Sequence, residues 1–280
     1  MVGAPGAPAP GTLHIVSTPI GNLGDLGGRA VEVLRGVAAI LAEDTRHTRV
    51  LCERFEIRTP LLAYHEHNEA QATPGLVRRL LGGESFALVS DAGTPLVSDP
   101  GARLARAAID AGVPVSPVPG PSAVLAALAG AGLPTDRFTF FGFLPRKGAE
   151  RTRTLAEVTA LGHTAVLYEA PGRVGDTLAA LSGLGAGARE AVVARELTKQ
   201  FEEFRRGTVD ELARYYGEHE ARGEVVLLVG GASPATVDEA ALREAAGTLR
   251  AGGLSAREVM RVLQETHHAP RNLAYRIAHE

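Results

Sequence analysis

The sequence predicts an α/β protein with two α/β domains and a helical C-terminal segment. Short apolar runs alternate with stretches whose apolar residues recur at spacings of three and four and that end in glycine, a pattern typical of strands alternating with helices. Glycine and proline come together near mid-chain, at residues 131–137, and the strand-like runs stop near residue 233. We therefore expect a disordered tail at residues 1–11, an N-terminal α/β domain at 12–132, a C-terminal α/β domain at 133–232 and helices at 233–280.

Eight runs are expected to be strands, because each is short, apolar and bounded by turn residues. In chain order they are residues 13–17, 37–42, 86–90, 113–118, 138–143, 164–169, 191–196 and 224–230. Helical patterns such as GARLARAAIDAG and SAVLAALAGAG lie between them, so we expect largely parallel sheets. In the C-terminal segment Ser255 and Glu258 form a capping-box pattern at the start of a helix.

Composition limits the classes of protein that the chain can belong to. The single cysteine, Cys52, excludes an intramolecular disulfide framework and a cysteine-rich zinc site, so we expect a cytoplasmic location. No apolar run reaches the roughly 18 residues of a membrane span, and residues 1–11 lack the basic start and apolar core of a signal peptide. The closely spaced pair His65 and His67 has no further ligand at a recognisable spacing, so no metal site is predicted. With a net charge of -3, any contact to nucleic acid must come from local clusters of arginine and lysine.

Three loops rich in glycine and proline follow expected strands, where a doubly wound sheet binds its ligand. The first, STPIGNLGDL, is not the dinucleotide fingerprint, because Gly21 and Gly24 have a different separation and Pro19 stiffens the turn. Another, PVPGPSA, carries Ser122, which either caps the next helix or contacts a ligand. Each loop is therefore either a ligand-binding loop or merely a tight connection.

The remaining loop, SDAGTPLVSDPG at residues 90–101, contains Ser-Asp-x-Gly twice. In the first copy Gly93 lets the backbone approach a ligand closely, and Thr94 offers a hydroxyl. In the second copy Asp99 is expected to be the N-cap of a helix that begins directly afterwards. The first copy is thus predicted to shape a binding loop and the second to start a helix; two successive structural turns are the alternative.

Charged residues also stand where strands end. Glu43, Asp44, Arg46 and His47 follow the run at 37–42, and such a cluster is either a salt-bridged turn or part of a site. In the second domain the residues at strand ends form either ordinary surface or the polar wall of a cleft: Tyr168, Glu169, Arg195, Glu196, Lys199 and Glu224.

Basic residues cluster in LPRKGAERTR and in the helical C-terminal segment. They either contact phosphates or lie on solvated helical faces. The candidates for phosphate contact are Arg146, Lys147, Arg151, Arg153, Arg257, Arg261 and Arg271.

Taken in order, seven motifs resemble those of the tetrapyrrole methylase superfamily, and within it the ribosomal RNA 2′-O-methyltransferases. They are STPIGNLGDL, AEDTRHT, SDAGTPLVSDPG, PGPSA, FFGFLPRKG, YEAPGRV and RELTK, spread over residues 12–232. The resemblance implies two α/β domains with S-adenosylmethionine in the cleft between them, usually a homodimer, and 2′-O-methylation of a cytidine in the decoding region of small-subunit ribosomal RNA. Members that act on porphyrin precursors have Gly-Asp-Pro where this chain has Gly93-Thr94-Pro95, a departure that argues against a tetrapyrrole acceptor.

The resemblance also implies which residues hold the cofactor. They lie on the three loops of the first domain and at strand ends of the second: Pro19, Gly21, Ser90, Asp91, Ala92, Gly93, Thr94, Pro95, Ser98, Ser122, Ala123, Tyr168 and Leu197. The basic candidates named above would then contact RNA.

A ribose hydroxyl is a weak nucleophile, so a base or a cation that stabilises the developing alkoxide should assist the transfer. The candidate bases are Glu43 and Asp44, with His47 behind them, and the candidate cations are Lys199 and Arg195. Two other functions stay open: methylation of a porphyrin-like small molecule, and noncatalytic binding to RNA or the ribosome.

Overall fold

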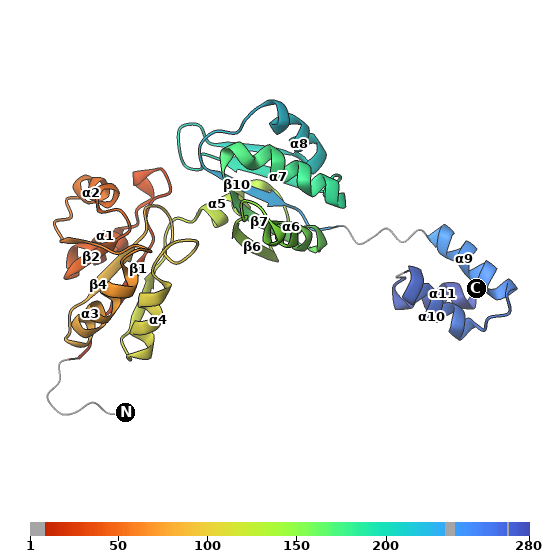
Figure 1. The fold of residues 1–280 in the computed structure, drawn as a ribbon, viewed down its shortest axis with the longest axis horizontal. Helices are drawn as coiled ribbons and strands as arrows, with labels where there is room; N and C mark the ends of the chain where they lie inside the picture. The colour runs from red at the N-terminus through yellow and green to blue at the C-terminus, as the bar shows by residue number, and fades with distance from the viewer. Residues whose placement is uncertain (1–8, 233–238, 268) are drawn as a thin grey trace. The chain divides into compact units, whose positions relative to one another are not determined.

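The computed structural model describes residues 9–232, 239–267 and 269–280, and Figure 1 shows its ribbon. Residues 1–8 of the expected tail lie outside the described residues. The chain forms two compact units, of which the first ends at Gly231 and the second begins at Ala232. Strands and helices alternate in the first unit, and the described part of the second is helical. The predicted α/β class with a C-terminal helical segment is therefore confirmed.

The first sheet is parallel throughout and has the strand order β3-β2-β4-β1-β5. Every residue of β2 and β4 is buried, as expected for central strands with helices on both faces. The third strand was missed because its three residues, LLA, are too few and too exposed to give a strand pattern. The strands are β1 (Leu13–Val16), β2 (Ala39–Ala42), β3 (Leu61–Ala63), β4 (Phe86–Val89) and β5 (Val115–Val118).

Helices cover both faces of this sheet. They are the short turn η1 (Leu23–Asp25), α1 (Gly28–Gly36), α2 (Thr45–Arg54), α3 (Glu69–Leu81) and α4 (Ala102–Asp110). Phe86 and Leu88 of β4 pack in one apolar cluster with residues of α3 and α4, whereas Ala87 and Val89 pack in another with residues of α1 and α2. The alternation of side chains along a strand thus builds two cores around one sheet.

The second sheet is mixed, so the prediction of largely parallel sheets is wrong for this half. Its order is β6-β7-β10-β8-β9; β6 and β7 are parallel, and the other neighbours are antiparallel. Residues 196–202 join β8 directly to β9, a connection too short for parallel neighbours. The strands are β6 (Phe138–Phe143), β7 (Thr164–Glu169), β8 (Glu190–Arg195), β9 (Glu203–Thr208) and β10 (Val225–Val229).

Helices of the second half pack mainly on one face of this sheet. They are α6 (Ala149–Ala160), the turn η2 (Pro171–Arg173), α7 (Val174–Leu181), the turn η3 (Ser182–Ala186) and α8 (Val209–Glu218). Leu178 of α7 and Leu212 of α8 belong to the same buried cluster as Leu167 and Leu227 of the sheet.

The opposite face of the second sheet is covered by α5 (Ala123–Ala131), which follows the last strand of the first sheet. Val124 and Leu128 of this helix pack in one cluster with Val166 and Leu228. The helix therefore lies N-terminal to the predicted boundary at residues 132 and 133 but packs on the second sheet, and that boundary stays a prediction.

The second unit contains α9 (Glu239–Ala251), α10 (Ala256–His267) and α11 (Arg271–His279). Leu242, Leu263 and Ile277 are buried together between these helices. The predicted capping box is confirmed, because Ser255 N donates to Glu258 Oε2 at 2.9 Å and Glu258 N donates to Ser255 Oγ at 3.4 Å. In the described ranges, no helix combines the length and apolar character that crossing a membrane requires.

Candidate functional site

The loops after β1, β4 and β5 are tied to one another at the carboxyl edge of the first sheet. Thr18 N donates to Gly93 O at 2.8 Å, and Gly93 N donates to Thr18 O at 3.1 Å. The hydroxyls of Ser17 and Thr94 lie 2.9 Å apart, and Thr94 Oγ1 donates to Pro121 O at 3.3 Å. Segments that are distant in sequence thus form one polar platform.

The second Ser-Asp-x-Gly copy does not cap a helix, which corrects the prediction for Asp99. Helix α4 begins at Ala102 after Gly101, and no side chain caps it. Gly101 has φ +123°, and a Cβ there would lie 2.4 Å from Leu88 Cδ2, so both the backbone and the packing favour glycine. Leu96 and Ser98 also have positive φ, at 72° and 69°. Backbone strain of this kind clusters at functional sites.

The register of the second sheet brings a set of polar and aromatic residues to one of its edges. Phe143 pairs with Tyr168 across β6 and β7, and Tyr168 pairs with Val226 of the antiparallel β10. Glu224, which directly precedes β10, therefore lies at the same edge. The Phe143 and Tyr168 rings are 5.3 Å apart between centroids.

A cavity of about 330 Å³ lies between these two groups of residues. This is within the usual size range of a small-molecule site. Its lining includes eight of the predicted cofactor residues: Asp91, Ala92, Gly93, Thr94, Ser98, Ser122, Ala123 and Tyr168. Ser122 also caps α5 by accepting a hydrogen bond from Leu125 N.

The other predicted cofactor residues do not line this cavity. Pro19 and Ser90 line a neighbouring hollow of about 30 Å³ together with His47. Gly21, Pro95 and Leu197 line neither space. Glu224, which the sequence offered as part of either ordinary surface or the polar wall of a cleft, also lines the cavity. Five lining residues were not predicted: Ile20, Val97, Asp99, Phe143 and Val226. Asp99 was assigned to a helix cap instead, and only strand register brings Phe143 and Val226 to the cavity.

Carboxylates dominate the electrostatics of the cavity. Glu43, Asp91, Asp99 and Glu224 line it. Burial raises the pKa of Glu43 above its ordinary value, and the negative charges of Asp91 and Asp99 raise it further. Burial also raises the pKa of Asp99. A ligand with a positively charged centre would relieve this repulsion.

Asp44 has a different role from that predicted, although it follows Glu43 directly. Its carboxylate caps α2 by accepting from Arg46 N at 2.8 Å, and it pairs with the Arg46 guanidinium at 2.7 Å. These hydrogen bonds hold the pKa of Asp44 far below its ordinary value. A base must bind a proton readily, so the structure argues against Asp44 and leaves Glu43 as the better candidate. His47 is exposed.

The two candidate cations differ in their surroundings. Arg195 pairs with Glu203 at 2.6 Å and lines a different cavity from Glu43. Lys199 Nζ contacts Glu196 at 2.8 Å and the cavity residue Glu224 at 3.0 Å. Burial lowers the pKa of Lys199, but hydrogen bonds to the two carboxylates outweigh it and leave the pKa above its ordinary value. Lys199 therefore carries a proton beside the site.

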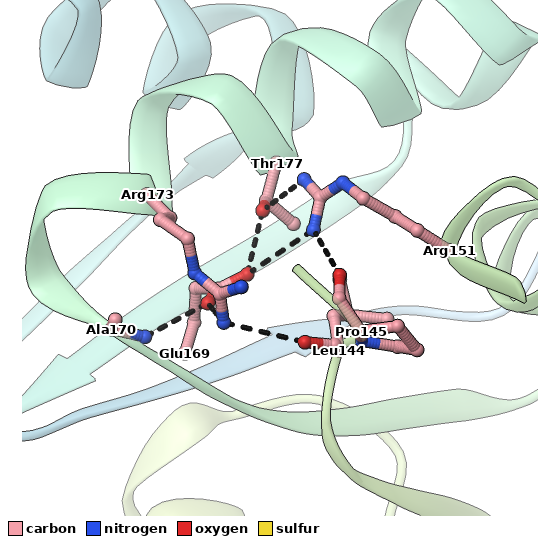
Figure 2. Close-up of polar contacts among 7 residues, drawn as sticks. All are labelled: Leu144, Pro145, Arg151, Glu169, Ala170, Arg173 and Thr177. Carbon is pink, nitrogen blue, oxygen red and sulfur yellow. Dashed lines mark hydrogen bonds and ion pairs between the residues drawn. The ribbon is translucent and has the colours of Figure 1, made fainter. Parts of the chain in front are cut away.

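The predicted basic patch is divided by the structure. Arg146, Lys147 and Arg153 are exposed, as are Arg257, Arg261 and Arg271 in the second unit. Arg151, in contrast, has a side chain that is only 15% exposed and points into the protein. Figure 2 shows its guanidinium between Thr177, Pro145 and the buried Glu169. The prediction that Arg151 contacts RNA is therefore wrong, because its hydrogen-bonding groups serve an internal network.

Among the described residues, no group of three or more histidine, cysteine, aspartate or glutamate side chains is placed to hold a metal ion. The rings of His65 and His67 lie 6.0 Å apart and make an edge contact with each other.

Comparison with known proteins identifies the family. The family model of the Tetrapyrrole (Corrin/Porphyrin) Methylases matches residues 12–213. The chain belongs to the tetrapyrrole methylase family. This confirms the resemblance drawn from the seven sequence motifs.

Relatives within the tetrapyrrole methylase family match over most of their length. A Xylella fastidiosa protein named Ribosomal RNA small subunit methyltransferase I is 53% identical over 226 residues, covering 80% of this chain and 83% of the relative. A Synechocystis protein of the same name is 44% identical over 273 residues, covering 96% and 98% of the two chains.

Solved structures support the tetrapyrrole methylase fold. Uroporphyrin-III C-methyltransferase from Thermus thermophilus, in complex with S-adenosylhomocysteine, aligns with a TM-score of 0.57 at 20% identity, covering 79% of this chain and 97% of the other. A diphthine synthase aligns with a TM-score of 0.60 at 14% identity, covering 79% and 89%. At these identities the likeness concerns the fold alone.

Proposed function

We propose that the chain is an S-adenosylmethionine-dependent methyltransferase of small-subunit ribosomal RNA, and that it methylates the ribose 2′-hydroxyl of a cytidine in the decoding region. The observation that carries the proposal is the 44% identity to a relative of that activity class over 96% of this chain. The relatives' names support the class of RNA, and the cytidine and its 2′-hydroxyl rest on the resemblance of the motifs.

The chemistry of the cavity fits this cofactor. S-adenosylmethionine supplies a methyl group on a positively charged sulfonium, which is a good leaving group in an in-line displacement. Glu43, Asp91, Asp99 and Glu224 provide negative charge around the cavity, and Ile20 with Val97 adds apolar surface for a thioether or an adenine. The Ala92 backbone in the lining offers polar groups that can contact polar edges, whereas the N–H of Gly93 is already donated to Thr18 O.

The acceptor is a hydroxyl, so the chain must orient it and accept its proton. Glu43 is the proposed general base, because it lines the cavity and its pKa is raised by burial and by neighbouring carboxylates. Lys199 is the proposed cation near the developing alkoxide, with Glu224 linking it to the cavity wall. Positioning of the two reactants accounts for much of the rate enhancement expected of such a site.

The proposed base is tested by Glu43→Gln. Turnover should fall by roughly 10²- to 10⁴-fold, the usual share of general base catalysis, while cofactor affinity stays within a few-fold of wild type. Glu53→Gln is the matched control, because Glu53 is exposed on the helix that follows Glu43. Full turnover in Glu43→Gln would remove Glu43 from the mechanism and leave the methyltransferase assignment intact.

The function itself is tested with labelled S-adenosylmethionine. The full chain is incubated in parallel with unmodified small ribosomal subunits, free small-subunit RNA and a tetrapyrrole precursor, and the methylated nucleotide is mapped. Label on a cytidine ribose, recognised by resistance of the adjacent phosphodiester to alkali, is the expected result. Label in the tetrapyrrole instead, or cofactor binding without label in any RNA, would overturn the proposal in favour of the other two functions.

The proposed RNA surface consists of the exposed basic residues of the patches: Arg146, Lys147, Arg153, Arg257, Arg261 and Arg271. The proposed compartment is the cytoplasm, where small subunits are assembled, and the proposed assembly is a homodimer. Sedimentation of the full chain across a range of concentrations tests the assembly, and a single monomeric species throughout would contradict it.

A further inference from the structure

Phe143 is an exposed aromatic residue at the wall of the candidate site. It ends β6, lines the cavity and is 60% exposed. Its ring leans on Tyr168, which in turn contacts Phe140 at 4.9 Å between centroids. Phe143 thus presents an exposed aromatic face beside a polar cavity, a surface on which a planar ring can stack.

Two cationic side chains follow this ring in the sequence, after Leu144 and Pro145. Arg146 and Lys147 are exposed, and neither side chain forms a hydrogen bond or ion pair within the described ranges. Single-stranded RNA is bound by this combination, in which an aromatic ring stacks on a base and nearby cations contact the phosphates.

A buried charge network fixes the backbone between the ring and the cations. Figure 2 shows Arg173 donating to Leu144 O and Arg151 donating to Pro145 O, at 3.3 Å and 3.4 Å. Both guanidinium groups are ion-paired with Glu169, whose side chain is fully buried. The carbonyl groups of the two residues after Phe143, Leu144 and Pro145, are therefore both fixed by hydrogen bonds, as expected of a preorganised binding surface.

We propose that Phe143 is the platform on which the base of the acceptor nucleotide stacks, and that Arg146 and Lys147 bind the phosphates beside that nucleotide. This inference rests on the proposed methyltransferase function and adds the residues that position the acceptor. Stacking orients a ribose relative to a fixed ring plane, so the platform serves to bring the 2′-hydroxyl to the cavity. The Glu169 network positions the platform and does not contact the RNA.

Steady-state kinetics on small subunits test the platform. Phe143→Ala removes the ring, Phe143→Leu keeps apolar bulk against Tyr168 without an aromatic face, and Phe143→Tyr keeps the face. We expect the first two to raise the KM for small subunits by roughly 5- to 150-fold, the loss of one base–aromatic stack, and Phe143→Tyr to remain close to wild type. The dissociation constant of S-adenosylmethionine, measured by calorimetry, should change by less than the KM in Phe143→Ala and Phe143→Leu, because Phe143 is only one of the residues that line the cavity.

Phe138→Ala is the matched control, because Phe138 is 40% exposed at the other end of the same strand and lies outside the cavity. It should leave both constants unchanged. An unaltered KM in Phe143→Leu, or a loss of cofactor affinity equal to the loss of activity, would overturn the platform. Wild-type enzyme that methylates no small-subunit RNA would instead overturn the proposed function, so the two failures are distinguishable.

Discussion

Replacing Glu169 with glutamine removes the negative charge that two inward-pointing arginines share. The Glu169 carboxylate is paired with Arg173 and lies 3.9 Å from Arg151 Nη1. It also accepts from Ala170 N at 2.8 Å and from Thr177 Oγ1 at 2.7 Å. Glutamine has nearly the same shape, so the substitution deletes charge while it leaves little cavity.

The expected cost is large because the charges are buried. Removing one partner of a buried ion pair typically costs about 3–5 kcal/mol, since the remaining charge stays desolvated without compensation. In the described structure two buried nitrogen atoms of Arg173, Nε and Nη1, already lack a hydrogen-bond partner. Without the Glu169 charge, the Arg173 guanidinium would therefore have few interactions to compensate for its desolvation. A stability of roughly 5–15 kcal/mol is usual for a domain, so the variant should lose a substantial fraction of it.

Urea unfolding followed by tyrosine fluorescence measures this loss. The chain has no tryptophan, and four of its five tyrosines, all but Tyr275, lie in the unit that contains Glu169. Glu84→Gln is the matched control, because Glu84 pairs with Arg79 at 2.6 Å while both side chains are more than 40% exposed, and pairs this exposed contribute little. Thr177→Val, which removes one buried hydroxyl, should cost about 1–3 kcal/mol if the main variant fails to fold. Equal unfolding free energies for Glu169→Gln and Glu84→Gln would refute the reasoning.

Three further predictions follow from the site. Burial raises the pKa of Asp99 above its ordinary 3.8, so the wild-type protein loses stability as pH rises through the folded-state pKa. Asp99→Asn should therefore unfold at a higher urea concentration than wild type at pH 7 but not below pH 3.8. An equal difference between the two proteins at both pH values would contradict this. Gly21→Ala should lower the free energy of unfolding by about 1–3 kcal/mol, because φ is +155° and the new Cβ would lie 2.4 Å from Lys199 Cγ. Gly27→Ala should not lower it, because a Cβ at Gly27 meets nothing within 4 Å. Replacing both Arg146 and Lys147 by glutamine should reduce the steepness of log affinity for single-stranded RNA against log salt concentration by about 1.4. Binding measurements at several salt concentrations would detect this change, and an unchanged slope would exclude both phosphate contacts.

The first sheet was largely predictable because its strands β2 and β4 are buried on both faces. FALV of β4 is buried at every position and reads as a continuous apolar run. The opposite holds for β9, whose sequence EFRRGT carries three charged side chains and is only partly buried at an edge of the second sheet. Such a strand forms because β8 offers it backbone partners along its whole length, which no local pattern reveals. The mixed character of the second sheet escaped prediction for the same reason.

The site shows a similar division between local and long-range information. Loop residues such as Gly93 and Thr94 could be assigned because glycine and hydroxyl groups after a buried strand have a direct chemical reading. Asp99 could not, because Ser-Asp-x-Gly before a helix is also a capping pattern, and only the structure shows that Gly101 is the N-cap residue and that no side chain caps α4. Arg151 was predicted to be an exposed cation because it lies on α6, whereas its buried partner Glu169 lies at the end of β7.

The mixed topology of the second sheet has a chemical consequence for the site. In a parallel sheet only the carboxyl ends of strands meet at one edge, so residues that precede a strand lie at the far edge. Because β10 is antiparallel to β7 and β8, its amino end meets their carboxyl ends, and Glu224 lies beside Tyr168 and within 3.0 Å of Lys199 Nζ. The antiparallel strand thus supplies a carboxylate that joins the ammonium group to the wall of the cavity. A fully parallel second sheet with the same sequence would separate these groups by the length of a strand, and the proposed cation would no longer stand next to the proposed methyl-transfer site.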